Sequence, residues 1–192
     1  MLRATFQAAQ SKEDASPVVK RAMKNELPLF AVSRTQHDIR ALFSLADEFS
    51  IHPTVIGAQE AWQVTDELVD RKVNVILQPV TPGSSRGSEA TRIAANMANR
   101  LHEADVPFCF SGSGLLNQAR FAVRFGLPKP AALQAMTSDA AEILGVGDKV
   151  GTISIGKAAD LVALSGDPLE FTTPIQWVMV DGVIQFEEAD NR

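Results

Sequence analysis

The sequence predicts an α/β fold, in which a parallel sheet with helices outside it is followed by a small β-rich appendage. From residue 27 to residue 114, short apolar runs of strand length alternate with amphipathic segments of helical spacing, four times in a row. This alternation is typical of a parallel sheet, because each helix returns the chain to the same edge. Past Gly151 the pattern changes to short β-type segments, which predict the appendage.

Four apolar runs are the predicted strands of the parallel sheet, at residues 29–32, 53–56, 73–77 and 106–110. After the first run, Thr35 is the predicted N-cap of an amphipathic helix. The apolar stripe of this helix comprises Ile39, Leu42, Phe43, Ala46 and Phe49.

The helix after the second run is predicted as one element over residues 60–71, with Ala61, Val64 and Leu68 on one face. Ser88 is the predicted cap of the next helix. The apolar stripe of that helix comprises Ala90, Ile93, Ala94, Met97, Leu101 and Ala104.

After the fourth run, three shorter helices are expected. Residues 115–125 form the first, which stops at Gly126, a residue suited to the left-handed conformation that ends many helices. Residues 128–136 and 138–144 form the other two.

The appendage is expected to contain strands at residues 152–155 and 161–164 and a hairpin over residues 176–186. Asp181-Gly182 predicts a type I′ turn, in which both central residues need a positive φ. The chain is therefore divided into residues 1–148, which carry the strand–helix units, and residues 149–192, which carry the appendage.

Composition and charge exclude several classes of protein. A net charge of −5 without any Lys/Arg cluster argues against a nucleic-acid binder. The lone Cys109 excludes an intramolecular disulfide, and its apolar neighbours favour a buried side chain over a nucleophile. No apolar run approaches membrane-spanning length and the first residues do not read as a signal peptide, so we expect a cytoplasmic protein. That expectation lapses if the natural chain begins further upstream.

Segments near the carboxyl end share an order and spacing with a known family. They are Leu-Gly at 144–145, Gly-Lys-Ala-Ala-Asp-Leu-Val at 156–162, Gly-Asp-Pro-Leu at 166–169 and Val-Asp-Gly at 180–182. This series resembles the end of the amidohydrolase superfamily, particularly its imidazolonepropionase-like branch. The resemblance implies the carboxyl-terminal half of a (β/α)8 TIM barrel, with strands five to eight, followed by part of a small β-sandwich. Within the series, a structural role is favoured, with a turn at Gly156-Lys157 and backbone capping by Asp160.

The same resemblance implies where metal ligands would stand. Intact members bind one or two divalent metals such as zinc, which activate water for attack on an amide-like carbon. His residues are expected at the ends of the fifth and sixth strands and Asp after the eighth, but this chain has Val32, Gly57 and Ser113 there. Valine and glycine have no ligating side chain, and serine is a poor divalent ligand and a poor base. We therefore expect no catalytic residue, metal ligand or cofactor site in this chain.

Other polar residues give weaker indications. His37, His52 and His102 share no metal-ligand spacing, so surface or helix-end contacts are expected of them. Loops at the carboxyl ends of the last barrel strands often bind phosphate through backbone N–H groups. A candidate anion-binding rim therefore comprises Arg34, Arg86, Ser111, Gly112 and Ser113, although a tight turn with solvated arginines is the favoured interpretation.

Two functions from different classes stay in view. The first is part of a hydrolase of carbon–nitrogen bonds other than peptide bonds, inactive as an isolated chain. The second is a metal-free binding or scaffold module that descends from such an enzyme and binds a small anion. No membrane or nucleic-acid partner is expected.

The half-barrel leaves two open strand edges, at residues 29–32 and 106–110. Unless residues 1–25 fold across the open side, we expect a homodimer, pairing with a separately encoded amino-terminal half, or aggregation. Side chains expected to point into the open barrel without an opposing layer are Val55, Val75, Leu77, Phe108 and Phe110.

Overall fold

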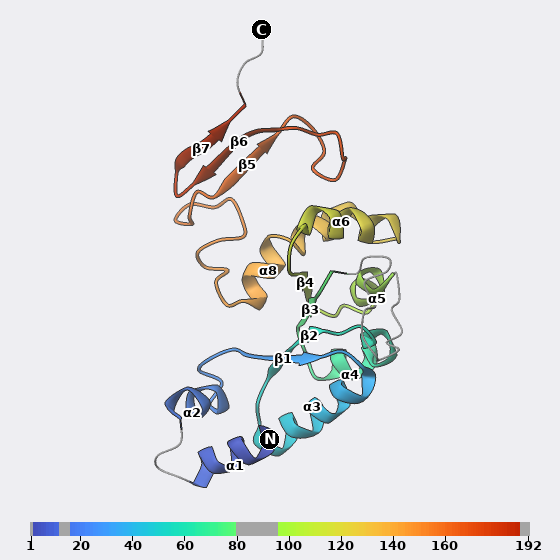
Figure 1. Ribbon diagram of the computed structural model, residues 1–192, viewed down its shortest axis with the longest axis vertical. Helices are drawn as coiled ribbons and strands as arrows, with labels where there is room; N and C mark the ends of the chain where they lie inside the picture. Colours follow the sequence, from blue (N-terminus) through green and yellow to red (C-terminus); the bar gives the residue numbers. More distant parts are fainter. Residues whose placement is uncertain (1, 12–15, 80–95, 189–192) are drawn as a thin grey trace.

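A four-stranded parallel sheet is the centre of the larger part of the molecule (Figure 1). The computed structural model describes residues 2–11, 16–79 and 96–188. The strands lie side by side in sequence order with every pair parallel, and they are β1 (Leu29–Ser33), β2 (Pro53–Gly57), β3 (Val75–Leu77) and β4 (Phe108–Phe110). The predicted α/β class and the four predicted strands are confirmed.

One face of this sheet is covered by helices. The helices that follow the four strands in turn are α3 (Gln36–Phe49), α4 (Thr65–Asp70), α5 (Met97–Glu103) and α6 (Leu115–Arg124). In the main core, Ile39 of α3, Leu68 of α4 and Leu101 of α5 are fully buried in one cluster with Val55 and Val75. Burying a side chain of this size contributes roughly 1.5–3 kcal/mol, so this layer holds the sheet and helices together.

The capping of α3 follows directly from its sequence. The Thr35 hydroxyl accepts a hydrogen bond from the Asp38 N–H at 3.1 Å, and an Asp38 carboxylate oxygen accepts one from the Thr35 N–H at 3.2 Å. This reciprocal pair satisfies two N–H groups that the first turn of a helix leaves without partners. The predicted stripe of five apolar residues is buried, as expected.

The helix predicted over residues 60–71 is broken, and that prediction is wrong in its continuity. A 3₁₀ turn, η1 (Ala61–Gln63), precedes α4, and between them Val64 has φ −137° and ψ 23°, outside the helical region. Ala61, Val64 and Leu68 are all buried, so the predicted face is correct. The Val64 N–H bonds to the Ala61 carbonyl, three residues before it, as in a 3₁₀ turn, and the three side chains still lie on one face.

The side chains that the sequence predicts inside the open barrel face the helices instead. Val55, Val75, Leu77, Phe108 and Phe110 lie in the helix-covered core, so the expectation that they lack an opposing layer is wrong. The register places a second row, Val32, Ile56, Ile76 and Cys109, on the opposite face. In that row Ile76 and Cys109 pack against Ile143 of α8 (Ser138–Ile143), whereas Val32 is 64% exposed.

The amino-terminal segment forms α1 (Leu2–Ser11) and α2 (Pro17–Met23), and α1 packs on α3. Phe6 and Phe49 lie with ring centroids 5.3 Å apart, beside Leu45 and Ile51. These contacts place α1 next to the helix layer, at the start of β1, and Val32 stays exposed on the other face. Among the described residues, no helix is long and apolar enough to cross a membrane.

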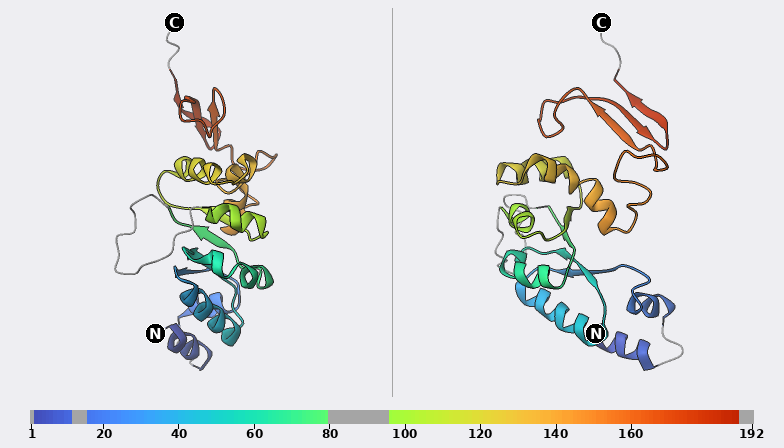
Figure 2. Two further views of the ribbon diagram at one scale, coloured as in Figure 1. Left: turned by 90° about the vertical axis from the view of Figure 1, so that its right-hand side faces the viewer. Right: turned by 180° about the vertical axis from the view of Figure 1, so that it is seen from behind.

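After α6, the chain forms α7 (Lys129–Gln134) and α8 and then an antiparallel sheet at the far end of the molecule from α1 (Figure 2). Gly126 ends the α6 region with φ 107°, as predicted. The second sheet comprises β5 (Leu161–Leu164), β6 (Ile175–Val180) and β7 (Val183–Glu187), in that order.

Two features of the appendage follow from its turn residues. Asp181 and Gly182 have φ values of 53° and 79°, which confirms the predicted tight turn between β6 and β7. Gly156 has φ 89° in the predicted turn, and Asp160 accepts a hydrogen bond from the Asp181 N–H at 2.8 Å, as expected for a capping residue. The GKAAD segment therefore stabilises the fold.

The strand predicted at residues 152–155 does not form. These residues lie between Gly151 and Gly156, which both have positive φ, and Ile153 and Ile155 are exposed. Two chain reversals so close together leave too few residues to reach a neighbouring strand. The prediction was wrong because an apolar alternation of four residues carries no information on whether a pairing strand is present. The helix stripe predicted from Ser88 lies partly outside the described residues, and α5 contains its Met97 and Leu101.

Candidate functional site

The carboxyl ends of β1–β4 form one edge of the parallel sheet, where ligand sites of parallel α/β folds are found. Arg34 follows β1, Gln78 follows β3 and Ser111 follows β4, while Gly57 is the last residue of β2. This edge therefore collects Arg34, Ser111 and Ser113 of the polar residues that the sequence singled out.

Arg34 and Gln78 lie over Gly57. A Cβ atom on Gly57 would stand 3.4 Å from Cγ of Arg34 and 3.5 Å from Oε1 of Gln78. Gly57 has φ 96°, a conformation that strains any residue with a side chain. Gln78 was missed in the sequence, although it follows the third strand directly, as Arg34 follows the first. The structure thus places a cation and an amide where a histidine was expected.

The other two expected ligand positions do not converge with Gly57. The register pairs Val32 with Ile56 and Ser33 with Gly57, so the Val32 and Gly57 positions face opposite sides of the sheet. Ser113 is exposed in the loop beyond β4. The three positions therefore form no common site.

The loop from Ser111 to Gly114 is held as a tight turn. The Ser111 N–H and hydroxyl both donate to the Leu77 carbonyl, at 2.9 and 3.1 Å. The Gln118 side chain donates to the carbonyl oxygen of Ser111 at 2.9 Å. Gly112 and Gly114 both have positive φ, which the turn requires. The Ser111 hydroxyl is thus already bonded to the protein backbone.

The candidate anion-binding rim is only partly brought together. Arg34 follows β1 and the serine loop follows β4, which are the two outer strands of the sheet. Three strand spacings separate them, or about 14 Å. Arg86 lies outside the described residues. Arg34 and the serine loop lie at the same edge of the sheet, and the anion site remains a prediction.

His52 and His102 lie apart from this edge, whereas His37 stands in the first turn of α3, three residues after Arg34. His37, His52 and His102 are all exposed, and the His52 backbone N–H donates to the Asn25 side-chain oxygen at 3.2 Å. Within residues 2–11, 16–79 and 96–188, no three His, Cys, Asp or Glu side chains are grouped so that they could hold a metal ion.

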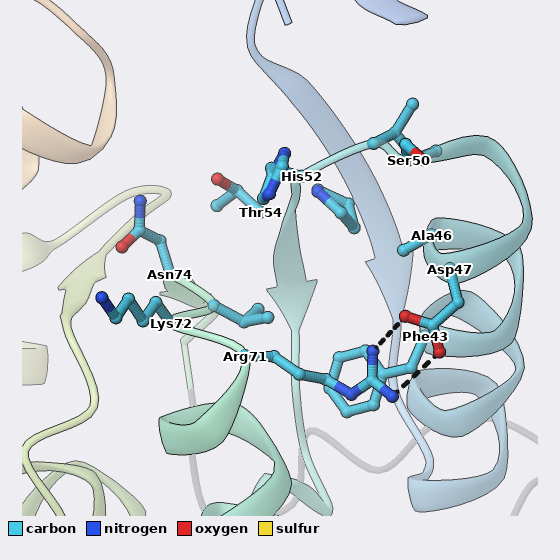
Figure 3. A pocket seen from close by; sticks show the side chains of 12 residues that line it. Phe43, Ala46, Asp47, Ser50, His52, Thr54, Arg71, Lys72 and Asn74 are labelled. Atoms are coloured by element: carbon cyan, nitrogen blue, oxygen red, sulfur yellow. Dashed lines mark hydrogen bonds and ion pairs between the residues drawn. The ribbon is translucent and has the colours of Figure 1, made fainter.

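A cavity of about 480 Å³ opens at the opposite end of the strands, near the starts of β2 and β3 (Figure 3). Arg71 lies over the Phe43 ring, 5.0 Å from its centroid, and donates to both carboxylate oxygens of Asp47 at 2.6 and 2.9 Å. The hydrogen bond from Arg71 lowers the pKa of Asp47. His52, Lys72 and other residues complete the lining. The pair joins α3 to the residue that follows α4, and an exposed ion pair of this kind contributes little to stability.

Cys109 is buried on the face of the sheet that α8 covers. Burial, with a smaller contribution from the nearby Asp139, raises the pKa of its thiol to about 11. The thiolate is the reactive form of cysteine, so this side chain behaves as a small apolar residue, as the sequence predicted.

Comparisons of the sequence with known proteins point to one family. Residues 11–185 match the sequence model of the Amidohydrolase family. Amidohydrolase tasK of Hapsidospora irregularis is 42% identical over 65 residues, which cover 33% of this chain and 6% of that protein. The imidazolonepropionase of Maricaulis maris is 42% identical over 66 residues, which cover 33% of this chain and 16% of the relative. The chain thus matches a small part of each relative's length.

Solved structures show the same fold. An amidohydrolase from Thermotoga maritima superposes with a TM-score of 0.88 at 23% identity, over 97% of this chain and 55% of that one. A Xaa-Pro dipeptidase superposes with a TM-score of 0.65 at 17% identity, over 89% of this chain and 47% of that one. Molinate hydrolase superposes with a TM-score of 0.64 at 18% identity, over 84% of this chain and 43% of that one. The chain therefore spans about half the length of these structures.

Proposed function

Because the chain belongs to the amidohydrolase family, we propose that it is the carboxyl-terminal half of a metal-dependent hydrolase barrel. The family chemistry would be hydrolysis of carbon–nitrogen bonds other than peptide bonds. One observation carries the proposal: nearly the whole chain superposes on an amidohydrolase structure, yet it covers only 55% of that structure. Four parallel strands with outer helices, followed by an antiparallel sheet, match what half of such a barrel would contain.

We further propose that the isolated chain does not catalyse this reaction. The residues at the strand carboxyl ends do not fit a divalent metal, since Val32 and Gly57 offer no ligating atom. Gly57 also has a backbone conformation that a histidine would adopt only with strain. Bound metals in the family would supply an activated water molecule, so we assign no catalytic step to the residues of this chain.

Elemental analysis of the purified protein tests this proposal. We expect well under one equivalent of zinc, iron, manganese or nickel per chain, and no amidase or lactamase turnover when metal is added. Stoichiometric metal bound at the carboxyl ends of β1–β4 would overturn the assignment of Val32, Gly57 and Ser113 to ligand positions.

A second candidate function, metal-free binding of a small anion, is favoured by Arg34. Among the described residues, no carboxylate forms an ion pair with its guanidinium, unlike Arg40 and Arg71, which pair with Glu67 and Asp47. The Gln78 amide beside Arg34 supplies hydrogen-bond donors. An exposed cation of this kind suits a phosphate or carboxylate group.

Thermal denaturation with increasing phosphate or acetate tests the second function. We expect either anion to raise the melting temperature of the wild-type chain and not that of the Arg34→Met variant. Arg124→Met, which removes another exposed arginine, is the matched control and should respond as the wild type does. An equal response in all three proteins would show non-specific salt stabilisation.

A further inference from the structure

Helix α6 lies between the parallel sheet and the antiparallel sheet (Figures 1 and 2). It begins at Leu115, directly after the loop from Ser111 to Gly114 at the end of β4. Side chains of α6 form hydrogen bonds with this loop and also with residues 168–170, which precede β6. The helix therefore connects the edge that carries part of the candidate anion-binding rim with the segment that leads into the appendage.

The end of β4, just before this loop, is held from two sides. The Ser111 N–H donates to the Leu77 carbonyl of β3 at 2.9 Å. In a parallel strand, alternate residues turn their N–H groups to opposite sides, so the N–H of Phe110 turns away from β3. This outward N–H donates to the Ala135 carbonyl at the end of α7, at 3.2 Å. The strand end is therefore fixed by β3 and by α7.

The loop beyond the strand end is held by the first turns of α6. The Gln118 side-chain amide donates to the carbonyl oxygen of Ser111 at 2.9 Å and to that of Ser113 at 3.4 Å. The backbone N–H groups of Asn117 and Gln118 both donate to the Gly114 carbonyl, at 2.9 and 3.1 Å. A movement of this end of α6 therefore moves the carbonyl groups of the loop with it.

The contact of α6 with the appendage side is made by Arg120. Its guanidinium donates to the carbonyl oxygens of three consecutive residues, Pro168, Leu169 and Glu170, and lies over the Phe171 ring. The donors of a guanidinium are fixed in one plane, so three such bonds define the position of the segment relative to the helix. Leu169 is buried in the main core, which keeps this segment in place.

One further bond joins the two sets of contacts. Arg120 also donates to the Asn117 side-chain oxygen at 3.3 Å. Asn117 in turn bonds the Gly114 carbonyl through its backbone N–H and stands next to Gln118. A continuous series of contacts thus runs from the segment before β6 to the loop after β4. Every donor and acceptor in this series belongs to the described residues of this chain.

We propose that Arg120 is a positioning residue for the loop from Ser111 to Gly114. By fixing the first turns of α6 to the segment before β6, it sets where Gln118 holds the loop backbone. The anion-binding role of this loop rests on the second proposed function, whereas its restraint by Arg120 is measured without any anion. Failure of phosphate or acetate to act on the wild type would therefore overturn the anion site and leave the positioning role standing.

Amide hydrogen exchange of the full 192-residue chain, in a buffer without phosphate or carboxylates, tests the inference. We expect Arg120→Met to raise the exchange rates of the Ser111 and Gln118 N–H groups by roughly threefold or more, a size typical of coupling through a side-chain network. Arg120→Lys keeps the charge but not the planar set of donors, so it should raise the same rates by a smaller factor. It also provides the readout if Arg120→Met does not fold.

Two controls separate positioning from a general loss of stability. Arg124→Met changes an exposed arginine of the same helix and should leave the loop as it is in the wild type. Thr35→Ala removes the cap of α3, next to the opposite outer strand, and should raise exchange only at amides that open by global unfolding, such as that of the buried Val75. If Ser111 exchange rises equally in Thr35→Ala and Arg120→Met, Arg120 acts on stability alone and the inference is wrong.

A substitution at the loop end of the series gives a second readout. Gln118→Ala removes the donor to the loop. Because coupling between two sites is reciprocal, this change should raise exchange of the Leu169 N–H, which donates to the Asp167 carboxylate at 2.8 Å. The inference is overturned if the effect of Arg120→Met is confined to residues 167–171 and that of Gln118→Ala to the loop, since α6 then carries no coupling.

Discussion

At the scale of single residues, the polar side chains of this chain mostly bond to the protein itself. Ser111 bonds to Leu77, Asp160 to the Asp181 amide and Asp47 to Arg71. Among the described arginines, Arg34 and Arg124 make no side-chain hydrogen bond or ion pair, and Arg34 lies over Gly57, the end of β2, which carries no side chain. The sequence could predict which residue types stand at the strand ends, because they follow apolar runs. It could not predict that Arg34 and Gln78 meet over Gly57, which depends on strand register.

The cap of α3 gives a prediction at this scale. Replacing Thr35 by Ala removes the hydroxyl that accepts the Asp38 N–H and should lower the free energy of unfolding by about 1 kcal/mol. Ser44→Ala, which removes a hydroxyl in the middle of the same helix, should cost less. Urea denaturation measures the free energy of unfolding of both variants. Equal losses would show that the Thr35 hydroxyl contributes no more than a hydroxyl in the middle of the helix.

Asp38, which bonds to that hydroxyl through its N–H, should make the stability of the protein depend on pH. The Thr35 hydrogen bond lowers the pKa of Asp38 below its ordinary value of 3.8. A lowered pKa means that the carboxylate stabilises the fold above about pH 4 and that this contribution is lost as pH falls through the folded-state pKa. We expect the stability difference between the wild type and Asp38→Asn to shrink as pH drops below about 4. A difference that is constant over this range would contradict the linkage.

At the scale of elements, the strands and α3 were predictable because their apolar residues recur with a clear period. The break at Val64 was not, since the same three apolar residues satisfy both a continuous helix and a 3₁₀ turn followed by a helix. The predicted direction of the Val55 and Val75 side chains was also wrong, since they face the helices and not the open side of the sheet. In a half-sheet, both faces of β2 and β3 are apolar, so alternation cannot distinguish the face toward the helices.

The junction between α6 and the segment before β6 gives a test at this scale. Arg120 donates to the carbonyl oxygens of Pro168, Leu169 and Glu170, at 3.0, 3.2 and 2.7 Å. Its guanidinium also lies 4.4 Å from the centroid of the Phe171 ring. These contacts hold the buried Leu169 in the main core.

Arg120→Met removes all of these contacts and should destabilise the protein by about 1–3 kcal/mol, with faster amide exchange over residues 167–171. Arg124→Met, one turn further along α6 and exposed, should leave both quantities close to the wild type. Denaturation and amide exchange of the two variants provide the measurement. If both variants behave alike, the junction does not depend on Arg120.

At the scale of the whole molecule, two sheets with different exposure lie along one long axis (Figure 1). The parallel sheet has a thick helix layer on one face, whereas the antiparallel sheet presents apolar side chains to solvent. The register places four of them, Val162, Val180, Val183 and Phe186, on one face around the half-buried Val178. An exposed patch of this kind is typical of a surface that another protein segment covers.

This face should bind a hydrophobic dye in the native protein. We expect Val183→Lys to reduce the native fluorescence of a naphthalene sulfonate dye without lowering the melting temperature, because the side chain is already exposed. Val69→Lys, which changes an exposed valine on α4, is the control and should leave the signal unchanged. If Val69→Lys reduces the fluorescence, or if Val183→Lys leaves it unchanged, the dye binds to another surface.

The hydrogen bond from Phe110 to Ala135 also bears on how far assembly can proceed. In the language of polymer chemistry, a subunit with two reactive ends grows into chains of unlimited length, whereas a monofunctional subunit terminates the reaction on its first encounter. By occupying the outward N–H of Phe110, Ala135 blocks part of the β4 edge for such growth. The end of α7 thus acts as a partial chain terminator at this side of the sheet.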